Sequence, residues 1–344
     1  MRARLLLIPF IFSVPVHAQD VPSQAGANPP VQVEQVPVRD LSQLPMDGGW
    51  TYGELLGKAA AGDFRANMLA GEYWMGLYYL NRGDLPLACL EHMQHFFREA
   101  AAKSGHPAPK LMMTDPYGIF GIFKAQSMQP EHAEWLDACR KLAEKGDMDA
   151  VTALYTVTDL PEAELKRYLA PLEKKAASGD QDALAQLAFI RVDWLKEDPG
   201  KVLESLEKHR KNAKPVLLAR MGELALSLGG GPSGNDPDGR KWRDMAVQPL
   251  SQAAEKGHAA AMRLLAEMTK GTAAEQSGKL LAELRSRGDL ETLLGDLSGC
   301  MKEKRGTVDG YLLQTLFDQA RKLGSNNAYA WYAQLVSEAK PPQE

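Results

Sequence analysis

The sequence has few of the features that mark several classes of protein. It contains three cysteines in 344 residues, which excludes a small fold held together by disulfides. Lysine and arginine number 40 against 44 aspartates and glutamates, giving a formal net charge of -4. This balance argues against a dedicated nucleic-acid-binding protein, because such proteins carry a basic surplus. No run of 18 apolar residues occurs after the first 18 positions, so the sequence predicts no membrane span.

Motifs for catalysis and cofactor binding are also absent from the sequence. No Ser-His-Asp set, carboxylate pair or nucleotide-binding motif occurs, so we expect no catalytic residue, no metal and no cofactor. His92 and His95 lie three residues apart, but not in the His-Glu-x-x-His order of zinc proteases. We interpret them as part of a polar helix face. The Gly-rich stretch 229–239 lacks the Gly-Lys-Ser/Thr of a phosphate-binding loop and is interpreted as a loop between repeats or a partner contact.

The first 18 residues have the features of a secretory signal peptide. Arg2 and Arg4 precede an apolar stretch. Val16 and Ala18 place small residues at the two positions that a signal peptidase recognises. Cleavage after Ala18 predicts export, most simply to a bacterial periplasm. Residues 19–50 are rich in Pro, Gln, Ser and Gly and are expected to form an extended leader.

Three cysteines are an odd number for an oxidising compartment. Cys89, Cys139 and Cys300 all lie in sequence typical of helices, which favours three buried, small apolar side chains. A disulfide between Cys89 and Cys139 remains open as an alternative.

From residue 51 onward the sequence is helical in pattern, with a recurring glycine at intervals of about 31 to 45 residues. An alanine follows four residues after each of five glycines: Gly62, Gly146, Gly179, Gly257 and Gly324. Gly105 and Gly288 fit this pattern partly, and Asn212 marks a degenerate unit. A glycine in the left-handed conformation ends one helix and opens a tight turn. An Asp directly after it, as at Asp63 and Asp147, can cap the next helix.

The pattern also predicts which residues are buried. Small residues four and nine positions after the glycine allow the two helices of a hairpin to approach closely. The residue eight positions after it fills the gap between hairpins, so we expect Leu154, Leu187, Leu265 and Tyr332 to be buried. The sequence therefore predicts an all-α fold of stacked antiparallel helix hairpins, with almost no strand.

Two segments resemble Sel-like repeats, which are relatives of the tetratricopeptide repeat. They are residues 59–74 and 253–266, and in the first the matching positions are Ala66, Ala70, Gly71 and Trp74, with Trp in place of the usual Tyr. The resemblance implies a curved α-solenoid over residues 51–340 with a concave groove. Irregular segments at 114–128 and 229–239 interrupt it. The regular cysteine pairs of the secreted, cysteine-rich branch of this family are missing.

The resemblance also implies a function. Exported soluble Sel-like proteins of this size resemble immunity proteins that protect bacteria against type VI secretion lipase effectors. The expected partner is therefore a secreted lipase-class toxin, with its active site covered in the periplasm. The alternative is a periplasmic scaffold or regulator in envelope or exopolysaccharide assembly. An enzyme is the least favoured class.

Aromatic residues are the candidate anchors for such a partner. A dense cluster surrounds Trp74, which occupies a core position of the repeat, and we expect at least two of these four aromatics to lie in the core. The apolar stretch 117–123 lies outside the repeat register and is either a plug over the core or a partner-binding element. The candidate anchors are Tyr73, Tyr78, Tyr79, Phe120 and Phe123.

Overall fold

The computed structural model describes residues 49–80, 86–114, 130–158, 160–232, 237–293 and 295–296. Within these ranges the regular secondary structure is helical and no strand occurs, which confirms the predicted all-α class. Several predictions concern residues outside the described ranges. These are the signal peptide, residues 19–48 of the leader, residues 115–128 and 233–236 of the two irregular segments, and Tyr332.

The described helices follow one another along the chain. Their bounds are α1 (Tyr52–Ala60), α2 (Phe64–Leu80), α3 (Pro86–Ser104), α4 (Pro107–Met112), α5 (Pro130–Ala143), α6 (Met148–Val157), α7 (Glu162–Ala177), α8 (Gln181–Phe189), α9 (Pro199–Glu207), α10 (Pro215–Leu228), α11 (Pro237–Glu255), α12 (Ala259–Thr269) and α13 (Ala274–Ser286). A π-helical turn, Ile190–Trp194, extends α8, and a 3-10 turn, Arg210–Asn212, precedes α10.

The recurring glycines form the turns, as the sequence predicts. Six of them have φ between +67° and +90°, a conformation that costs a residue with a Cβ atom: Gly62, Gly105, Gly146, Gly179, Gly257 and Gly288. The residue after each glycine caps the next helix. For example, the carboxylate of Asp63 accepts a hydrogen bond from the Ala66 amide at 2.8 Å, and that of Asp147 accepts one from the Ala150 amide at 2.9 Å. Asn212 is an exception, because its turn is 3-10 helical and its φ is not positive.

The positions predicted to be buried are buried wherever the structure describes them. Leu154, Leu187 and Leu265 are all in the core. The alanines four residues after the glycines are buried too: Ala66, Ala150, Ala183 and Ala261. At Gly71 an added Cβ atom would lie 2.4 Å from the Phe97 ring, so α2 and α3 pack without room for a methyl group.

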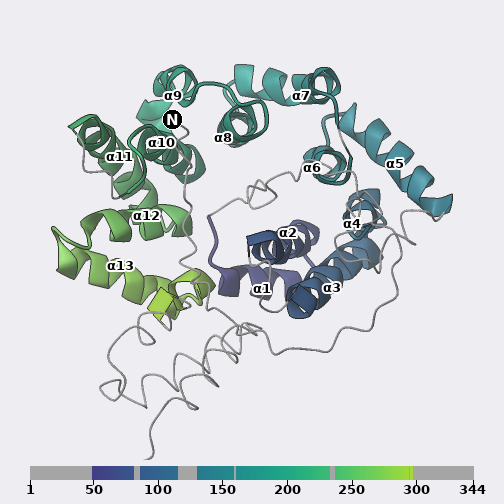
Figure 1. Cartoon of the computed structure of the whole chain (residues 1–344), viewed down its shortest axis with the longest axis horizontal. Coiled ribbons are helices and arrows are strands. Elements are labelled where there is room, and N and C mark those ends of the chain that lie inside the picture. The colour runs from purple at the N-terminus through teal and green to yellow at the C-terminus, as the bar shows by residue number, and fades with distance from the viewer. Residues whose placement is uncertain are drawn as a thin grey trace, which may run out of the picture.

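The hairpins are arranged in a ring (Figure 1). Helices α2, α6, α8 and α10 lie on its inner side, and α5, α7, α9 and α11 lie on its outer side. The sequence predicts a curved array, but it does not predict that the two ends of the described array meet. Helix α1 lies beside the end of α13 and closes the ring.

Apolar side chains form two cores within the ring. The first extends from Tyr52 to Trp194 and also contains Leu290 and Leu293. The second extends from Ala185 to Leu284. Helix α8 contributes to both cores and joins them on one side of the ring. None of the described helices combines the length and the apolar character that a membrane crossing requires.

Candidate functional site

The ends of the described array meet at a seam formed by residues 49–54, 257–263 and 287–292. Backbone groups more than 200 positions apart form a hydrogen bond here. The Gly53 amide donates to the Gly288 carbonyl at 2.9 Å. The Thr51 hydroxyl donates to the Arg287 carbonyl at 2.6 Å. An added Cβ atom at Gly53 would lie 2.9 Å from that same carbonyl oxygen. Only glycine therefore lets the start of α1 approach the turn this closely.

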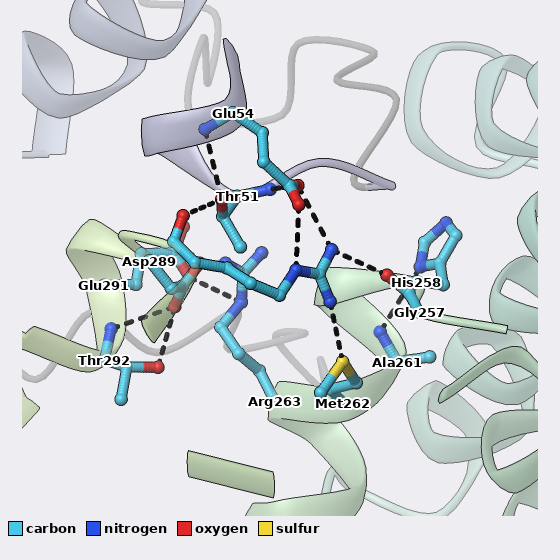
Figure 2. A network of polar contacts seen from close by, with 11 residues as sticks. Thr51, Glu54, Gly257, His258, Ala261, Met262, Arg263, Asp289, Glu291 and Thr292 are labelled. Carbon is cyan, nitrogen blue, oxygen red and sulfur yellow. Dashed lines mark hydrogen bonds and ion pairs between the residues drawn. The ribbon is translucent and has the colours of Figure 1, made fainter. Parts of the chain in front are cut away.

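A charged network ties the seam together (Figure 2). The Arg287 guanidinium donates to both carboxylate oxygens of Glu54, at 2.9 and 3.1 Å, and to the Gly257 carbonyl at 2.8 Å. Glu54 also accepts from the Thr51 amide at 2.9 Å and completes a capping box at the start of α1. Burial alone would raise the pKa of Glu54, but the hydrogen bonds from Arg287 and Thr51 outweigh it and lower the pKa.

A second ion-pair group lies beside the first in the seam. Asp289 is fully buried, pairs with Arg263, and accepts from the amide and hydroxyl of Thr292 at 3.1 and 2.7 Å. Arg263 also pairs with Glu291 at 3.0 Å. Asp289, Arg263 and Thr292 are therefore joined by ion-pair and hydrogen-bond contacts, which support the closure at the seam.

The aromatic cluster predicted from the sequence lies next to the seam. Tyr73 is buried, with its ring stacked on Tyr52 at 4.8 Å between centroids. Trp74 is buried as its repeat position predicts, and its indole donates to the Tyr52 hydroxyl. Tyr73 is therefore a core residue in this structure, with only 7% of its surface exposed.

The other candidate anchors and the cysteines are described only in part. The side chains of Tyr78 and Tyr79, on α2, are outside the described set, as are Phe120 and Phe123. Cys139 is a buried free thiol, and burial raises its pKa to about 12, as expected for a small apolar side chain. In the described ranges no three His, Cys, Asp or Glu residues are grouped as a metal would require. His92 instead stacks on Trp74 at 4.4 Å.

The inner helices carry a second polar feature that the sequence does not reveal. Glu72 on α2 is 1% exposed, and neither of its carboxylate oxygens has a hydrogen-bond partner. Burial raises its pKa to about 8, an effect that Arg65 partly opposes and Asp149 reinforces. The hydroxyl of Thr156 on α6 is also buried without a partner. Glu72 lies in ordinary helix-forming sequence, so nothing in the sequence distinguishes it from a surface glutamate.

Aromatic and arginine side chains link the inner helices further along the ring. Tyr155 on α6 stacks on Trp194 of the π-helical turn, with centroids 3.9 Å apart and planes at 8°. Arg220 on α10 lies over the Phe189 ring at 4.9 Å and pairs with Glu223 at 2.6 Å. Tyr155 and Arg220 are partly exposed, so the inner helices carry two of the residue types that dominate protein interfaces.

Comparisons with protein-family models, curated proteins and solved structures return no match to this chain.

Proposed function

We propose that this chain is a Sel-like repeat α-solenoid that binds another protein in the periplasm without catalysing a reaction. The left-handed glycine turns, the side-chain caps and the buried alanines four residues later support the repeat assignment. Consecutive turns also contact one another. His106 lies 3.2 Å from Asp147, and Lys256 donates to the Ala213 carbonyl at 3.3 Å. Such stacking is how hairpins of a solenoid bury faces that one hairpin cannot bury alone.

The inner helices offer the surface that we propose for the partner. In a solenoid the stacked cores fix the backbone, so side chains that project from one face can vary with the partner. The observation that carries this proposal is the partly exposed pair of Tyr155 and Arg220, each held by an aromatic neighbour. Tyrosine and arginine held in this way lose little side-chain entropy when a partner covers them.

We propose a type VI secretion lipase-class effector as the partner, with the chain acting as its immunity protein. An immunity protein must bind its toxin before the toxin acts. We therefore expect a nanomolar dissociation constant, which corresponds to a binding free energy of about −12 kcal/mol. The signal peptide predicted from the sequence agrees with this role, because such a toxin acts from the periplasm. The alternative is a scaffold or regulator in envelope or exopolysaccharide assembly, which would use the same inner surface.

Co-expression with a periplasm-directed lipase effector encoded next to this chain tests the role. We expect the exported chain to rescue growth and a form lacking residues 1–18 to fail. If neither form rescues growth and no complex is detected, the scaffold function becomes the better proposal.

A matched pair of variants tests the surface. Arg220→Ala on inner helix α10 should weaken the complex at least tenfold. Arg167→Ala on outer helix α7 should not, although Arg167 also lies over an aromatic ring, that of Tyr168, at 5.1 Å. If both variants weaken the complex equally, the inner helices do not form the binding surface. Thermal unfolding of both variants separates lost binding from lost stability.

A further inference from the structure

The two apolar cores of the ring meet at two places, and the contacts at these places differ in kind. On one side, α8 and the π-helical turn that follows it contribute apolar side chains to both cores. Ala185 and Val192 belong to the second core, whereas Ile190 belongs to the first. This join is continuous apolar packing, so it contains no charge that acid or salt could remove.

On the other side of the ring, the boundary between the cores runs through the seam. Leu290 and Leu293 pack in the first core, whereas Leu284 of α13 packs in the second. The boundary therefore falls between Leu284 and Leu290, in the turn that contains Arg287 and Asp289. The contacts that cross it here are polar.

Two arginines cross this boundary and hold three carboxylates. Arg263 on α12, a helix of the second core, pairs with Asp289 and with Glu291 at 3.0 Å (Figure 2). Arg287 pairs with Glu54 on α1, a helix of the first core, at 2.9 Å. These five residues are called the ionic lock below. The pair on α1 is partly open to water, so salt screens it.

Three other titratable groups face the ionic lock from neighbouring helices. They are Tyr73 on α2, His258 at the start of α12, and Glu283 on α13, which lies 3.7 Å from Arg287. Burial raises the pKa of Tyr73 above its ordinary value, so its hydroxyl stays neutral. Protonation of His258 adds positive charge beside the arginines. None of the three therefore replaces the negative charge that acid removes from the carboxylates.

The join at α8 has the backbone features of a hinge. Its π-helical turn is closed by a hydrogen bond from the Leu195 amide to the Ile190 carbonyl at 2.9 Å, five residues back. Lys196 follows directly and has a φ of +58°, a conformation that no other non-glycine residue adopts in the described ranges. Strained backbone of this kind occurs at functional sites and switch regions. Small changes of φ and ψ at such positions rotate the elements on either side.

We propose that the ring is a clamp that opens at the seam when the ionic lock loses its charge, with the π-helical turn as its hinge. Tyr155 of α6 stacks on Trp194 in that turn, and Arg220 of α10 lies over Phe189 beside it. The two helices pack in different cores, so opening changes the spacing of Tyr155 and Arg220. This consequence for binding rests on the protein-binding function proposed above, but the opening itself does not.

Hydrogen exchange and small-angle X-ray scattering of the free chain test the clamp. The lock variant is Glu54→Gln/Asp289→Asn, which removes two charges at nearly constant side-chain volume. The new amide oxygen at 289 can still accept the hydrogen bonds from Thr292. The matched control is Glu162→Gln/Asp182→Asn, because these two carboxylates also pair with cations but at the surface.

At pH 7 the lock variant should open where the control stays closed. We expect residues 49–55, which include the Gly53 amide bonded to Gly288, to exchange at least tenfold faster in the lock variant. Residues 183–190 should exchange equally in both variants, because the apolar join stays packed. The radius of gyration should rise only in the lock variant, with unchanged helical circular dichroism.

Acid should reproduce this change in the wild-type chain. The folded ring lowers the pKa of Glu54 below its ordinary value of 4.5, so the ionic lock is charged at neutral pH and loses charge as pH falls below 4.5. Lowering the pH from 7 to 3.5 should therefore raise the radius of gyration of the wild-type chain. The lock variant should show little further rise.

Three results would overturn the proposal. The first is equal exchange of residues 49–55 in the lock and control variants. The second is exchange of residues 183–190 that accelerates by the same factor, because the ring would then unfold instead of opening. The third is faster exchange at the seam with an unchanged radius of gyration, which means fraying of α1 alone.

A milder variant keeps the test possible if the lock variant does not fold. Glu54→Gln alone should still raise the exchange of residues 49–55 severalfold over Glu162→Gln, and equal exchange would contradict the clamp. None of these measurements needs a partner. The clamp can therefore fail while protein binding holds, and protein binding can fail while the clamp still opens.

Discussion

Asp289 at the seam and Glu72 on α2 are both buried carboxyl groups, but only Asp289 has hydrogen-bond partners. At the seam, Asp289 is fully buried and has Arg263 and Thr292 as partners. Glu72 on α2 and Thr156 on α6 are also buried, and their side-chain oxygens have no hydrogen-bond partner. A satisfied network adds rigidity and defines one structure, whereas unsatisfied groups cost stability. The difference separates an ion pair that supports the closure of the ring from a buried carboxyl that costs stability.

The largest expected effect follows from breaking the seam at its buried carboxylate. Asp289→Ala removes the partner of Arg263 and the cap of Thr292, so we expect a loss of about 3–5 kcal/mol in the free energy of unfolding. Urea denaturation measures it. Asp182→Ala is the matched control, because Asp182 also pairs with a cation, Lys214, but at the surface, and it should cost less than about 1 kcal/mol. Similar losses in both variants would contradict the structural role of the seam.

Removing the unpartnered carboxyl of Glu72 should instead stabilise the fold. The pKa of Glu72 is raised to about 8 in the folded chain, so between pH 4.5 and pH 8 the folded state holds a proton that the unfolded state has lost. Stability should therefore fall as pH rises through this window and level off above pH 8. Glu72→Gln should remove that slope and be more stable than wild type at pH 8 by roughly 2–4 kcal/mol. Denaturant midpoints from pH 5 to pH 8.5 check this. An unchanged slope would show that Glu72 is not buried as the structure has it.

The close approach at the seam should tolerate no side chain at Gly53. Gly53→Ala places a Cβ atom against the Arg287 carbonyl oxygen and should cost about 1–3 kcal/mol. Gly57 is four residues further along α1 and has nothing near its Cβ position. Gly57→Ala should therefore stabilise the helix by roughly 0.5–1 kcal/mol. A lower melting temperature for Gly53→Ala together with a higher one for Gly57→Ala would support the closed ring. Changes of the same sign in both variants would contradict it.

The smallest effect is expected at the exposed side of the seam. The Glu54–Arg287 pair is partly open to water, so Glu54→Gln should cost only about 0.5–1 kcal/mol. Because the folded state lowers the pKa of Glu54, its contribution is present above pH 4.5 and is lost as pH falls through that lowered value. The difference between variant and wild type should shrink below pH 4 and in 1 M salt. A difference that is constant from pH 3 to pH 7 would contradict this assignment.

The sequence predicted the parts of the fold that depend on neighbours along the chain. Gly146 takes a positive φ and Asp147 caps the next helix because both requirements arise within one turn. Leu154 is buried because the helical period places it on the packed face. The helical period did not decide whether Tyr73 is buried, because an aromatic residue beside a core tryptophan can face either side of the helix.

The candidate sites were hidden from the sequence for a different reason. Glu72 becomes exceptional only when the packed core excludes water from it, and no residue near it in the chain signals that exclusion. Tyr155 and Arg220 lie in ordinary helical sequence, and their aromatic neighbours, Trp194 and Phe189, come from the segment between them.

By itself, then, the sequence determined the helices, their turns and their caps, because these rest on backbone conformation and hydrogen bonds within a few residues. Only the tertiary structure decided that the array closes and that Glu72 loses its solvent. Closure joins Gly53 to Gly288 and Thr51 to Arg287, and such contacts depend on the summed curvature of every hairpin between them. Small rotations at each hairpin add up around the ring, and no local pattern in the chain encodes their total.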